Sequence, residues 1–226
     1  MGEMICFTSE SGEHQAYLAT PAGGSGPGII VLQEWWGLVP HIKDVSDRFA
    51  REGFVALAPD LYDGESTTEP DDAATLMQAL HIGETEHKLR GAVETLLALP
   101  GVSPKDAVGI VGFCMGGQLA MFAAGNNPAI KATVNFYGIH PKVQPSYRDI
   151  QGEVQGFFAE RDHMASPEAV KALSVELTTL EIPHEFKTYP GTDHAFFNDA
   201  RPEVYNPEAA KDAWQRMVEF FRGCLK

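Results

Sequence analysis

A chain of 226 residues, with 44% hydrophobic and 21% charged residues, has the composition of a folded globular protein and not of a disordered one. Its net charge of -14 at pH 7 argues against nucleic acid or an anionic membrane surface as a partner. The three cysteines, Cys6, Cys114 and Cys224, are too few and too scattered for a disulfide framework or a zinc site. A free thiol suits a reducing compartment.

The sequence also gives no sign of export or of membrane insertion. The first residues, Met1 to Met4, lack the basic start and the apolar core of a signal peptide. The longest uncharged apolar run, Ala107 to Gly117, is far shorter than the ~20 residues that a membrane span needs. We therefore expect a cytoplasmic protein without a membrane partner.

The first quarter of the chain predicts three strands and a helix. Two short strands, Met4 to Phe7 and His14 to Ala19, are separated by a Ser-Gly turn. The continuous apolar run from Gly28 to Glu34 is typical of a parallel strand that is covered on both faces. A helix that ends at Gly53 follows it, and its apolar stripe consists of Ile42, Val45 and Phe49.

The second quarter contains a further strand, a polar loop and a helical stretch. Phe54 to Ala58 is the strand, and the polar segment from Glu65 to Asp72 is expected at the rim of an active site. A helical stretch then runs to Leu99. The apolar run that begins at Val108 predicts a buried strand, which crosses Cys114 into an Ala- and Leu-rich helix.

The second half continues the same alternation. Strands are predicted at Ala132–Tyr137, Val154–Ala159 and Glu185–Tyr189, a loop at Pro141–Arg148, and helices that begin at Ser166 and Asn206. Strands that alternate with helices predict a mostly parallel central sheet with helices on both faces. We expect one α/β domain that spans residues 1–226.

The stretch around Cys114 carries the most distinctive local pattern. Gly112-x-Cys114-x-Gly116 has the form of the G-x-S-x-G nucleophile elbow, with sulfur in place of the usual hydroxyl. Cys114 would then lie at a helix N-terminus, where free N–H groups and the helix dipole favour a thiolate. The alternative is a buried cysteine that only fills space in a glycine-rich turn.

A base and an acid follow Cys114 in the chain order of the α/β-hydrolases. His194 follows the last predicted strand, and Asp162 lies just past the end of an earlier one. Side chains at the carboxyl ends of parallel strands share one edge of the sheet, so these groups can meet. Glu160 and Asp193 are rival acids, and Asp193 is expected to stabilise its own turn.

Glu34 is a second unusual carboxylate, because it stands at a strand end beside two tryptophans. It is either a salt-bridged or solvated loop acid, or a partly buried carboxylate close to the thiol. The backbone N–H groups of Trp35 and Met115 are the natural oxyanion-hole pair. Trp36 is expected either in the cleft or in the core.

Several motifs together resemble the dienelactone hydrolase (carboxymethylenebutenolidase) family, in matching order over about residues 5 to 225. They are Gln33-Glu34-x-x-Gly37, Ala58-Pro59-Asp60-Leu61-Tyr62, Gly112-Phe113-Cys114-Met115-Gly116-Gly117, Asp162 and Gly191-x-x-His194-x-Phe196. The cysteine elbow combined with the strand-end glutamate separates this family from serine esterases.

The resemblance implies an α/β-hydrolase fold, a Cys114–His194–Asp162 triad and a Glu34 that holds the resting thiol in check. It implies hydrolysis of a lactone or ester through an acyl-thioester intermediate. The candidates for substrate binding are Trp36, Tyr137, Phe196, Asn198 and Arg201.

The chain departs from the family pattern at the groups that hold a substrate carboxylate. Asn198 stands where family members have an arginine, four residues after the catalytic histidine, and Arg201 is the nearest arginine. No arginine occurs between Leu61 and Lys88, where the second is expected.

The alternatives are therefore a general carboxylesterase or thioesterase with a non-anionic substrate, and a non-catalytic thiol sensor on the same fold. The sequence shows neither a metal-ligand cluster nor a dinucleotide fingerprint, so no cofactor is expected. The expected partner is a small lactone or ester, and the expected assembly is a monomer or a small homo-oligomer.

Overall fold

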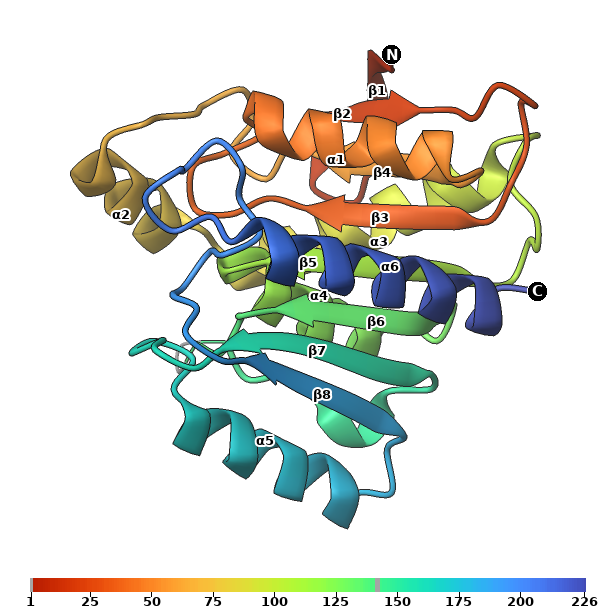
Figure 1. Cartoon of the computed structure of the whole chain (residues 1–226). Helices are drawn as coiled ribbons and strands as arrows, with labels where there is room; N and C mark the ends of the chain where they lie inside the picture. The colour runs from red at the N-terminus through yellow and green to blue at the C-terminus, as the bar shows by residue number, and fades with distance from the viewer. Residues whose placement is uncertain (1, 141–142) are drawn as a thin grey trace.

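The computed structural model describes residues 2–140 and 143–226. In this part of the chain, eight strands form one twisted sheet in the order β1-β2-β4-β3-β5-β6-β7-β8 (Figure 1). The strands are β1 (Glu3–Ser9), β2 (Gly12–Ala19), β3 (Gly28–Leu32), β4 (Val55–Pro59), β5 (Val108–Phe113), β6 (Ile130–Phe136), β7 (Glu153–Ala159) and β8 (His184–Tyr189).

The sheet is antiparallel at one edge and parallel elsewhere. The β1–β2 hairpin pairs antiparallel with itself and with β4, and every other neighbouring pair from β4 to β8 is parallel. The buried runs of β3, β4 and β5 have no exposed residue, because helices cover both faces. The parallel strands therefore all end at one edge of the sheet, and the loops that follow them meet there.

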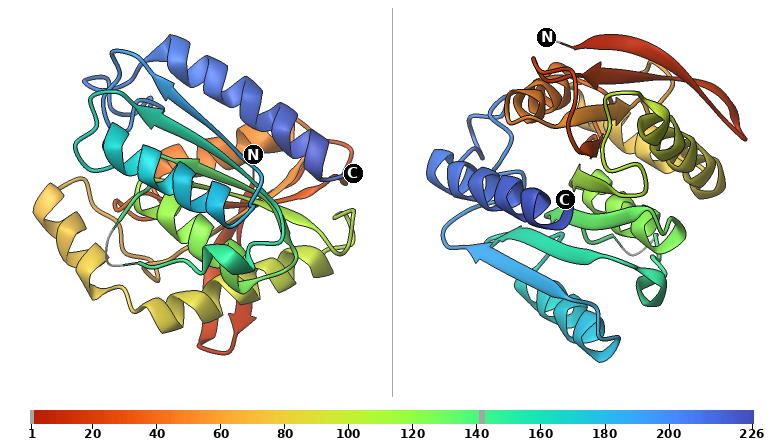
Figure 2. Two further views of the ribbon diagram at one scale, coloured as in Figure 1. Left: turned by 90° about the horizontal axis from the view of Figure 1, so that it is seen from below. Right: turned by 90° about the vertical axis from the view of Figure 1, so that its right-hand side faces the viewer.

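Two layers of helices enclose the sheet (Figures 1 and 2). Helices α1 and α6 cover one face, and α3, α4 and α5 cover the other. The helices are α1 (Pro40–Arg51), α2 (Pro70–Ala79), α3 (Ile82–Ala98), α4 (Met115–Asn126), α5 (Pro167–Thr179) and α6 (Pro207–Cys224). None of the helices described has both the length and the apolar character needed to cross a bilayer.

The expected α/β-hydrolase architecture is confirmed, and most element boundaries agree within two residues. The Oγ of Ser166 accepts a hydrogen bond from Ala169 N at 3.3 Å, and Asn206 caps α6 in the same way from Ala209 N at 3.0 Å.

Two predicted segments differ from the structure. The helical stretch that ends at Leu99 is two helices, because the backbone is extended at Leu80 and His81, and α2 begins inside the predicted polar rim. The predicted loop Pro141–Arg148 starts with two residues that lie outside the described part and ends in a short 3-10 turn, Tyr147–Asp149.

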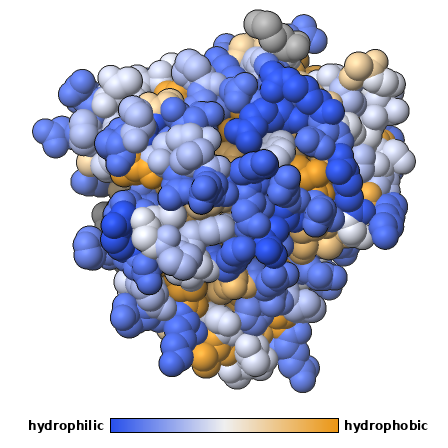
Figure 3. Space-filling view, viewed as in Figure 1, coloured by the Kyte–Doolittle hydropathy of each residue, from blue (hydrophilic) through white to orange (hydrophobic). Residues whose placement is uncertain are grey.

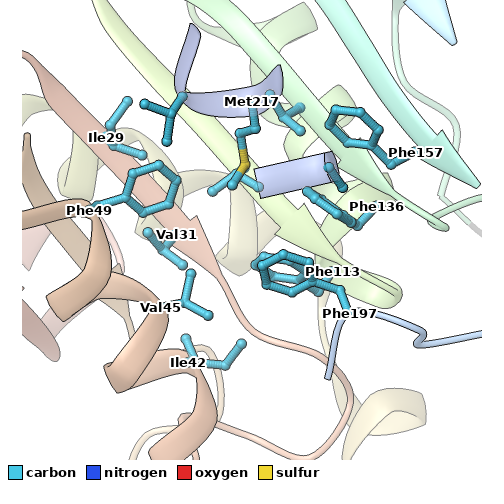
Figure 4. Close-up of a cluster of buried hydrophobic side chains, with 14 of the residues drawn as sticks. Ile29, Val31, Ile42, Val45, Phe49, Phe113, Phe136, Phe157, Phe197 and Met217 are labelled. Atoms are coloured by element: carbon cyan, nitrogen blue, oxygen red, sulfur yellow. The ribbon is translucent and has the colours of Figure 1, made fainter. Parts of the chain in front are cut away.

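The core on the α1/α6 side of the sheet is rich in phenylalanine (Figure 4). Phe113 at the end of β5 stacks on Phe197 with ring centres 5.2 Å apart, and Phe136 at the end of β6 lies 4.8 Å from both rings. These rings lie directly beneath the strand ends that precede Cys114 and the loop that follows His194. The outer surface in the view of Figure 3 is mostly hydrophilic with small scattered apolar areas.

Phe221 of α6 gives a test of this core. Its ring is fully buried and lies 5.9 Å from Phe49 and 6.3 Å from Phe54 between ring centres, and it fills the space above Gly109 of β5. We expect Phe221→Ala to lower the free energy of unfolding by about 3–5 kcal/mol through loss of burial and the cavity left behind. Urea denaturation measures the change.

The matched control is Phe220→Ala, because this neighbouring side chain is only partly buried. A loss of roughly 1 kcal/mol is expected there. Equal losses for the two variants would contradict the role assigned to Phe221.

Candidate active site

Cys114 sits at the turn between β5 and α4 in a strained backbone conformation. Its φ and ψ are 53° and -118°, a region that side-chain-bearing residues rarely adopt. Cys114 N donates to the Phe136 carbonyl at 3.0 Å, and Gly117 N donates to the Cys114 carbonyl at 3.0 Å. The surrounding hydrogen bonds thus hold the side chain, which is partly exposed, at the edge of the sheet.

The two flanking glycines are needed for this turn. A Cβ at Gly112 would lie 1.9 Å from the Gly116 carbonyl oxygen, and one at Gly116 would lie 2.4 Å from the Gln33 carbonyl oxygen. Strand and helix therefore pack backbone against backbone at the cysteine, as the sequence pattern predicts.

Asp162 and His194 lie together at the ends of β7 and β8. Asp162 Oδ2 is 2.6 Å from His194 Nδ1, and its Oδ1 accepts the amides of Met164 at 2.7 Å and Ala165 at 3.0 Å. Burial raises the pKa of Asp162, but the hydrogen bond and charge of His194 and these two amides lower it below its ordinary value overall. The carboxylate is thus ionised, buried and fully bonded.

The rival acids are occupied elsewhere. Glu160 Oε2 accepts Gly191 N at 2.7 Å, and Asp193 Oδ2 pairs with Arg161 Nη2 at 2.7 Å. Asp193 was expected to stabilise its own turn; its carboxylate instead bridges to the β7 loop, because the parallel strands bring the two loops side by side. Both bonds tie the loop that carries Asp162 to the loop that carries His194.

Cys114 completes the group around the histidine ring. Burial lowers the pKa of His194, but the bond to Asp162 and the interaction and charge of Cys114 raise it to about 10. His194 Nε2 is buried and has no regular hydrogen bond within the described residues. The thiol group therefore acts on the ring through a loose contact, which is common before a substrate binds.

Glu34 is buried at the end of β3 and is held by two side chains. Asn198 Nδ2 donates to Glu34 Oε2 at 2.6 Å, and the Tyr137 hydroxyl donates to Oε1 at 3.4 Å. Burial, followed by the charges of Glu34 and Cys114, raises the pKa of Tyr137 well above its ordinary value. The carboxylate is thus a buried group near the thiol and is not a solvated loop acid; its role as a modulator stays a prediction.

A cleft of about 400 Å³ opens beside these groups. Cys114, His194, Asp162 and Glu34 line it, together with Trp35, Trp36, Arg161, Met164 and Arg201. The N–H groups of Trp35 and Met115, the expected oxyanion pair, make no loop, turn or capping hydrogen bond within the described residues. Trp35 follows Glu34 and Met115 follows Cys114 in the chain, and their role as oxyanion donors stays a prediction.

Three of the five substrate-binding candidates have other surroundings. Tyr137 and Phe196 are 1% and 0% exposed, so they lie beneath the cleft and not on its wall. The Tyr137 ring packs 4.9 Å from the His194 ring, and the Phe196 ring lies 5.5 Å from Tyr137 between ring centres. Asn198 is 2% exposed and binds Glu34. Trp36 and Arg201 do line the cleft, as expected.

Tyr62, which lies near Cys114, and Met77, which lines the cleft, were not among the site residues expected from the sequence. The charge of Cys114 acts on the buried Tyr62, whose pKa is raised mainly by burial, and the Tyr62 hydroxyl donates to Met115 Sδ at 3.3 Å. Tyr62 belongs to the Ala58–Tyr62 motif of the family, so the sequence did contain a pattern that points to it. Met77 of α2 also lines the cleft, and no local pattern marks it, because its place depends on how α2 crosses the sheet edge.

The described residues include no group of three or more His, Cys, Asp or Glu side chains placed to hold a metal ion. The cleft brings together a thiol, an imidazole and a carboxylate that is bound to the imidazole. This set is the one used for acyl transfer.

Comparisons with known proteins agree with this geometry. The model of the dienelactone hydrolase family matches residues 14–225. "Protein usf" of Aquifex pyrophilus is 38% identical over the full length of both chains, and a "Putative carboxymethylenebutenolidase" of Aquifex aeolicus is 35% identical over the full length of both.

Among solved structures, a "Putative Dienelactone Hydrolase" from Klebsiella pneumoniae superimposes with a TM-score of 0.84 at 30% identity. The match covers 97% of this chain and 99% of that one. The chain therefore belongs to the dienelactone hydrolase family, with its α/β-hydrolase fold, and is a hydrolase of the class that cleaves ester or lactone bonds.

Proposed function

We propose that this protein hydrolyses small esters or lactones through a thioester on Cys114, with His194 as base and acid and Asp162 as the group that orients it. The observation that carries the proposal is the 2.6 Å contact between Asp162 and His194 beside a cysteine held in a nucleophile elbow. The names of the Aquifex aeolicus and Klebsiella pneumoniae relatives support the same class of substrate.

In the acylation step, Cys114 Sγ attacks the carbonyl carbon as a thiolate, and the π electrons of the carbonyl move onto its oxygen. The Trp35 and Met115 amides stabilise this oxyanion. The raised pKa of His194, about 10, keeps the ring protonated at neutral pH, so that Nε2 donates its proton to the departing alkoxide. A thioester and an alcohol result.

In the deacylation step, the now neutral His194 takes a proton from water, and the hydroxide attacks the thioester. Collapse of the second tetrahedral intermediate expels the Cys114 thiolate and releases the acid. Asp162 holds the Nδ1 proton of the ring in both steps, so Nε2 always faces the reaction. For a lactone, the alcohol and the acid leave as one molecule.

Glu34 acts on this cycle through its charge. A carboxylate close to a thiolate is repelled by it, and the hydrogen bonds from Asn198 and Tyr137 hold Glu34 in place by satisfying both of its oxygens. In this arrangement, Asn198 is a positioning residue for the carboxylate. No cofactor takes part in the proposed steps, and the partner is a small molecule.

Cys114→Ala tests the nucleophile. We expect hydrolysis of p-nitrophenyl acetate, measured by absorbance, to fall by at least about 10³-fold, because the covalent route is lost. The matched control is Cys6→Ala, an exposed cysteine in β1 far along the sheet order from β5. Near-wild-type turnover in Cys114→Ala would exclude the thioester route.

The protonation of His194 predicts a pH dependence. Its pKa is raised from 6.5 to about 10, so the favourable pairing with the thiolate and Asp162 is fully present below 6.5 and is lost as the pH rises through about 10. The effect of His194→Ala on the alkylation of Cys114 by iodoacetamide, followed by mass spectrometry, is therefore expected to be large at pH 7 and to be lost above about pH 10. In His194→Ala, the rate at pH 7 is expected to drop about tenfold or more.

A rate in His194→Ala equal to that of the wild type would show that the ring does not stabilise the thiolate. His163→Ala is the control, since this neighbouring histidine is exposed and lines the same cleft. Its substitution should leave the alkylation profile unchanged.

The anchoring of Glu34 gives a further prediction. In Asn198→Ala, the carboxylate loses the 2.6 Å bond that partly offsets its charge and therefore disfavours the nearby thiolate more strongly, so alkylation of Cys114 at pH 7 is expected to slow by about threefold to tenfold. The double variant Glu34→Gln/Asn198→Ala should recover the rate, since the repelling charge is gone. Slow alkylation in both variants would instead indicate a general loss of structure.

A further inference from the structure

A second hollow adjoins the catalytic cleft and takes no part in the proposed reaction. This side groove has a volume of about 510 Å³ and lies between the start of α1, the loop before α2 and the loop after His194. Trp36 and Arg201 line both the groove and the cleft, and the Arg201 guanidinium carbon is 5.8 Å from the Trp36 ring centre. These two side chains form the partition between the two spaces.

The walls of the side groove are mainly apolar. Trp36, Val39, Pro40 and Pro70 supply ring and methyl surface, and Thr68 and Ala200 stand at its border. Thr68 and Ala200 are both exposed, so the groove is open to solvent at this border. His41, Thr67 and Asn198 supply the polar lining, and the side chains of His41 and Asn198 are bound to Asp199 and Glu34. The apolar part of the wall favours an aliphatic or aromatic group.

Both arginines that line these spaces are paired with carboxylates. Of the described residues that line them, two are arginines: Arg161 pairs with Asp193 at 2.7 Å, and Arg201 pairs with Glu203 at 2.9 Å. Glu34 adds a further carboxylate, and the carboxylate of Asp162 is paired with the protonated His194. A negatively charged substrate would therefore have to displace a carboxylate from an arginine and approach a site with excess negative charge.

The positions of His194 and of the Trp35 amide decide whether the acyl part or the alcohol part of an ester faces the groove. The leaving oxygen must face His194 Nε2, beside the β7 and β8 loops, whereas the oxyanion amide of Trp35 directly precedes the partition at Trp36. The acyl chain then runs away from His194 and towards the groove.

We infer that the side groove binds the distal part of an uncharged acyl chain, and that the substrates are neutral esters with medium-length apolar acyl groups. This rests on the proposed function. The Arg201–Glu203 pair on the Trp36 ring makes the partition a specificity-determining element, because it keeps the arginine from binding a substrate carboxylate.

Three p-nitrophenyl esters test the inference: the acetate, the octanoate and the mono-ester of suberic acid, which has eight carbons and a terminal carboxylate. For the wild type, kcat/KM for the octanoate is expected to exceed that for the acetate by about tenfold and that for the suberate by at least about tenfold. A suberate hydrolysed as well as the octanoate would overturn the inference.

Two variants test whether the preference for acyl length depends on the groove and the preference for charge depends on the Arg201–Glu203 pair. Ala200→Trp fills the groove at its exposed border, and we expect kcat/KM for the octanoate to fall at least about fivefold while that for the acetate stays within about twofold. Glu203→Gln frees Arg201, and the ratio of suberate to octanoate kcat/KM is expected to rise about fivefold. Ala22→Trp, an exposed alanine in the loop before β3 at the opposite edge of the sheet, is the matched control.

Equal losses for the acetate and the octanoate in Ala200→Trp would show that the groove does not bind the acyl chain. This outcome is distinct from a failure of the proposed function. If acetate hydrolysis persists in Cys114→Ala, the thioester mechanism is wrong; if it is abolished there and chain length has no effect, only the groove assignment fails.

Discussion

The left-handed backbone at Cys114 is the constraint on which the rest of the site depends. It exists because β5 runs directly into α4 with no connecting loop, and two glycines allow the carbonyls of the neighbouring backbone to approach within contact. Strain of this kind persists only when the surrounding structure holds it in place. The phenylalanine layer under β5 and β6 and the hydrogen bond from Cys114 N to the Phe136 carbonyl provide that support.

The neighbouring groups depend on one another through charge. Asp162 is buried yet ionised, because two backbone amides and an imidazole satisfy it. The imidazole is in turn held in its protonated form by that carboxylate and by Cys114. Glu34 introduces a third negative group into the same space, and the amide of Asn198 and the hydroxyl of Tyr137 bind it. Asp162 and His194 therefore each shift the pKa of the other.

Much of this could be predicted from the sequence, because local patterns dictate it. The elbow spacing, the order of cysteine, acid and histidine, and the continuous apolar strands each follow from a physical requirement within a few residues. The contact of Asp162 with His194 was also predictable, since Asp162 lies far enough past the end of β7 for its loop to reach the loop after β8. The N-cap residues Ser166 and Asn206 could likewise be predicted from the sequence, because each precedes a proline at the start of its helix.

What the sequence could not supply are relations between distant segments. The burial of Tyr137 and Phe196 depends on how the loop after His194 folds back over the sheet, and nothing near either residue distinguishes a cleft wall from the core below it. The pairing of Asp193 with Arg161 depends on two loops lying side by side. The break between α2 and α3 has neither a glycine nor a proline to mark it.

The two bonds between the β7 and β8 loops, from Glu160 to the Gly191 amide and from Asp193 to Arg161, have a consequence for how such a protein changes over time. They hold the loop that carries Asp162 against the loop that carries His194. Neither of these two bonds involves the opposite wall of the cleft. That wall consists of Trp36, the segment before α2 and residues 198–203. Apart from Asn198, which holds Glu34, substitutions in that wall are expected to change what the enzyme accepts while Asp162 and His194 stay bound to each other.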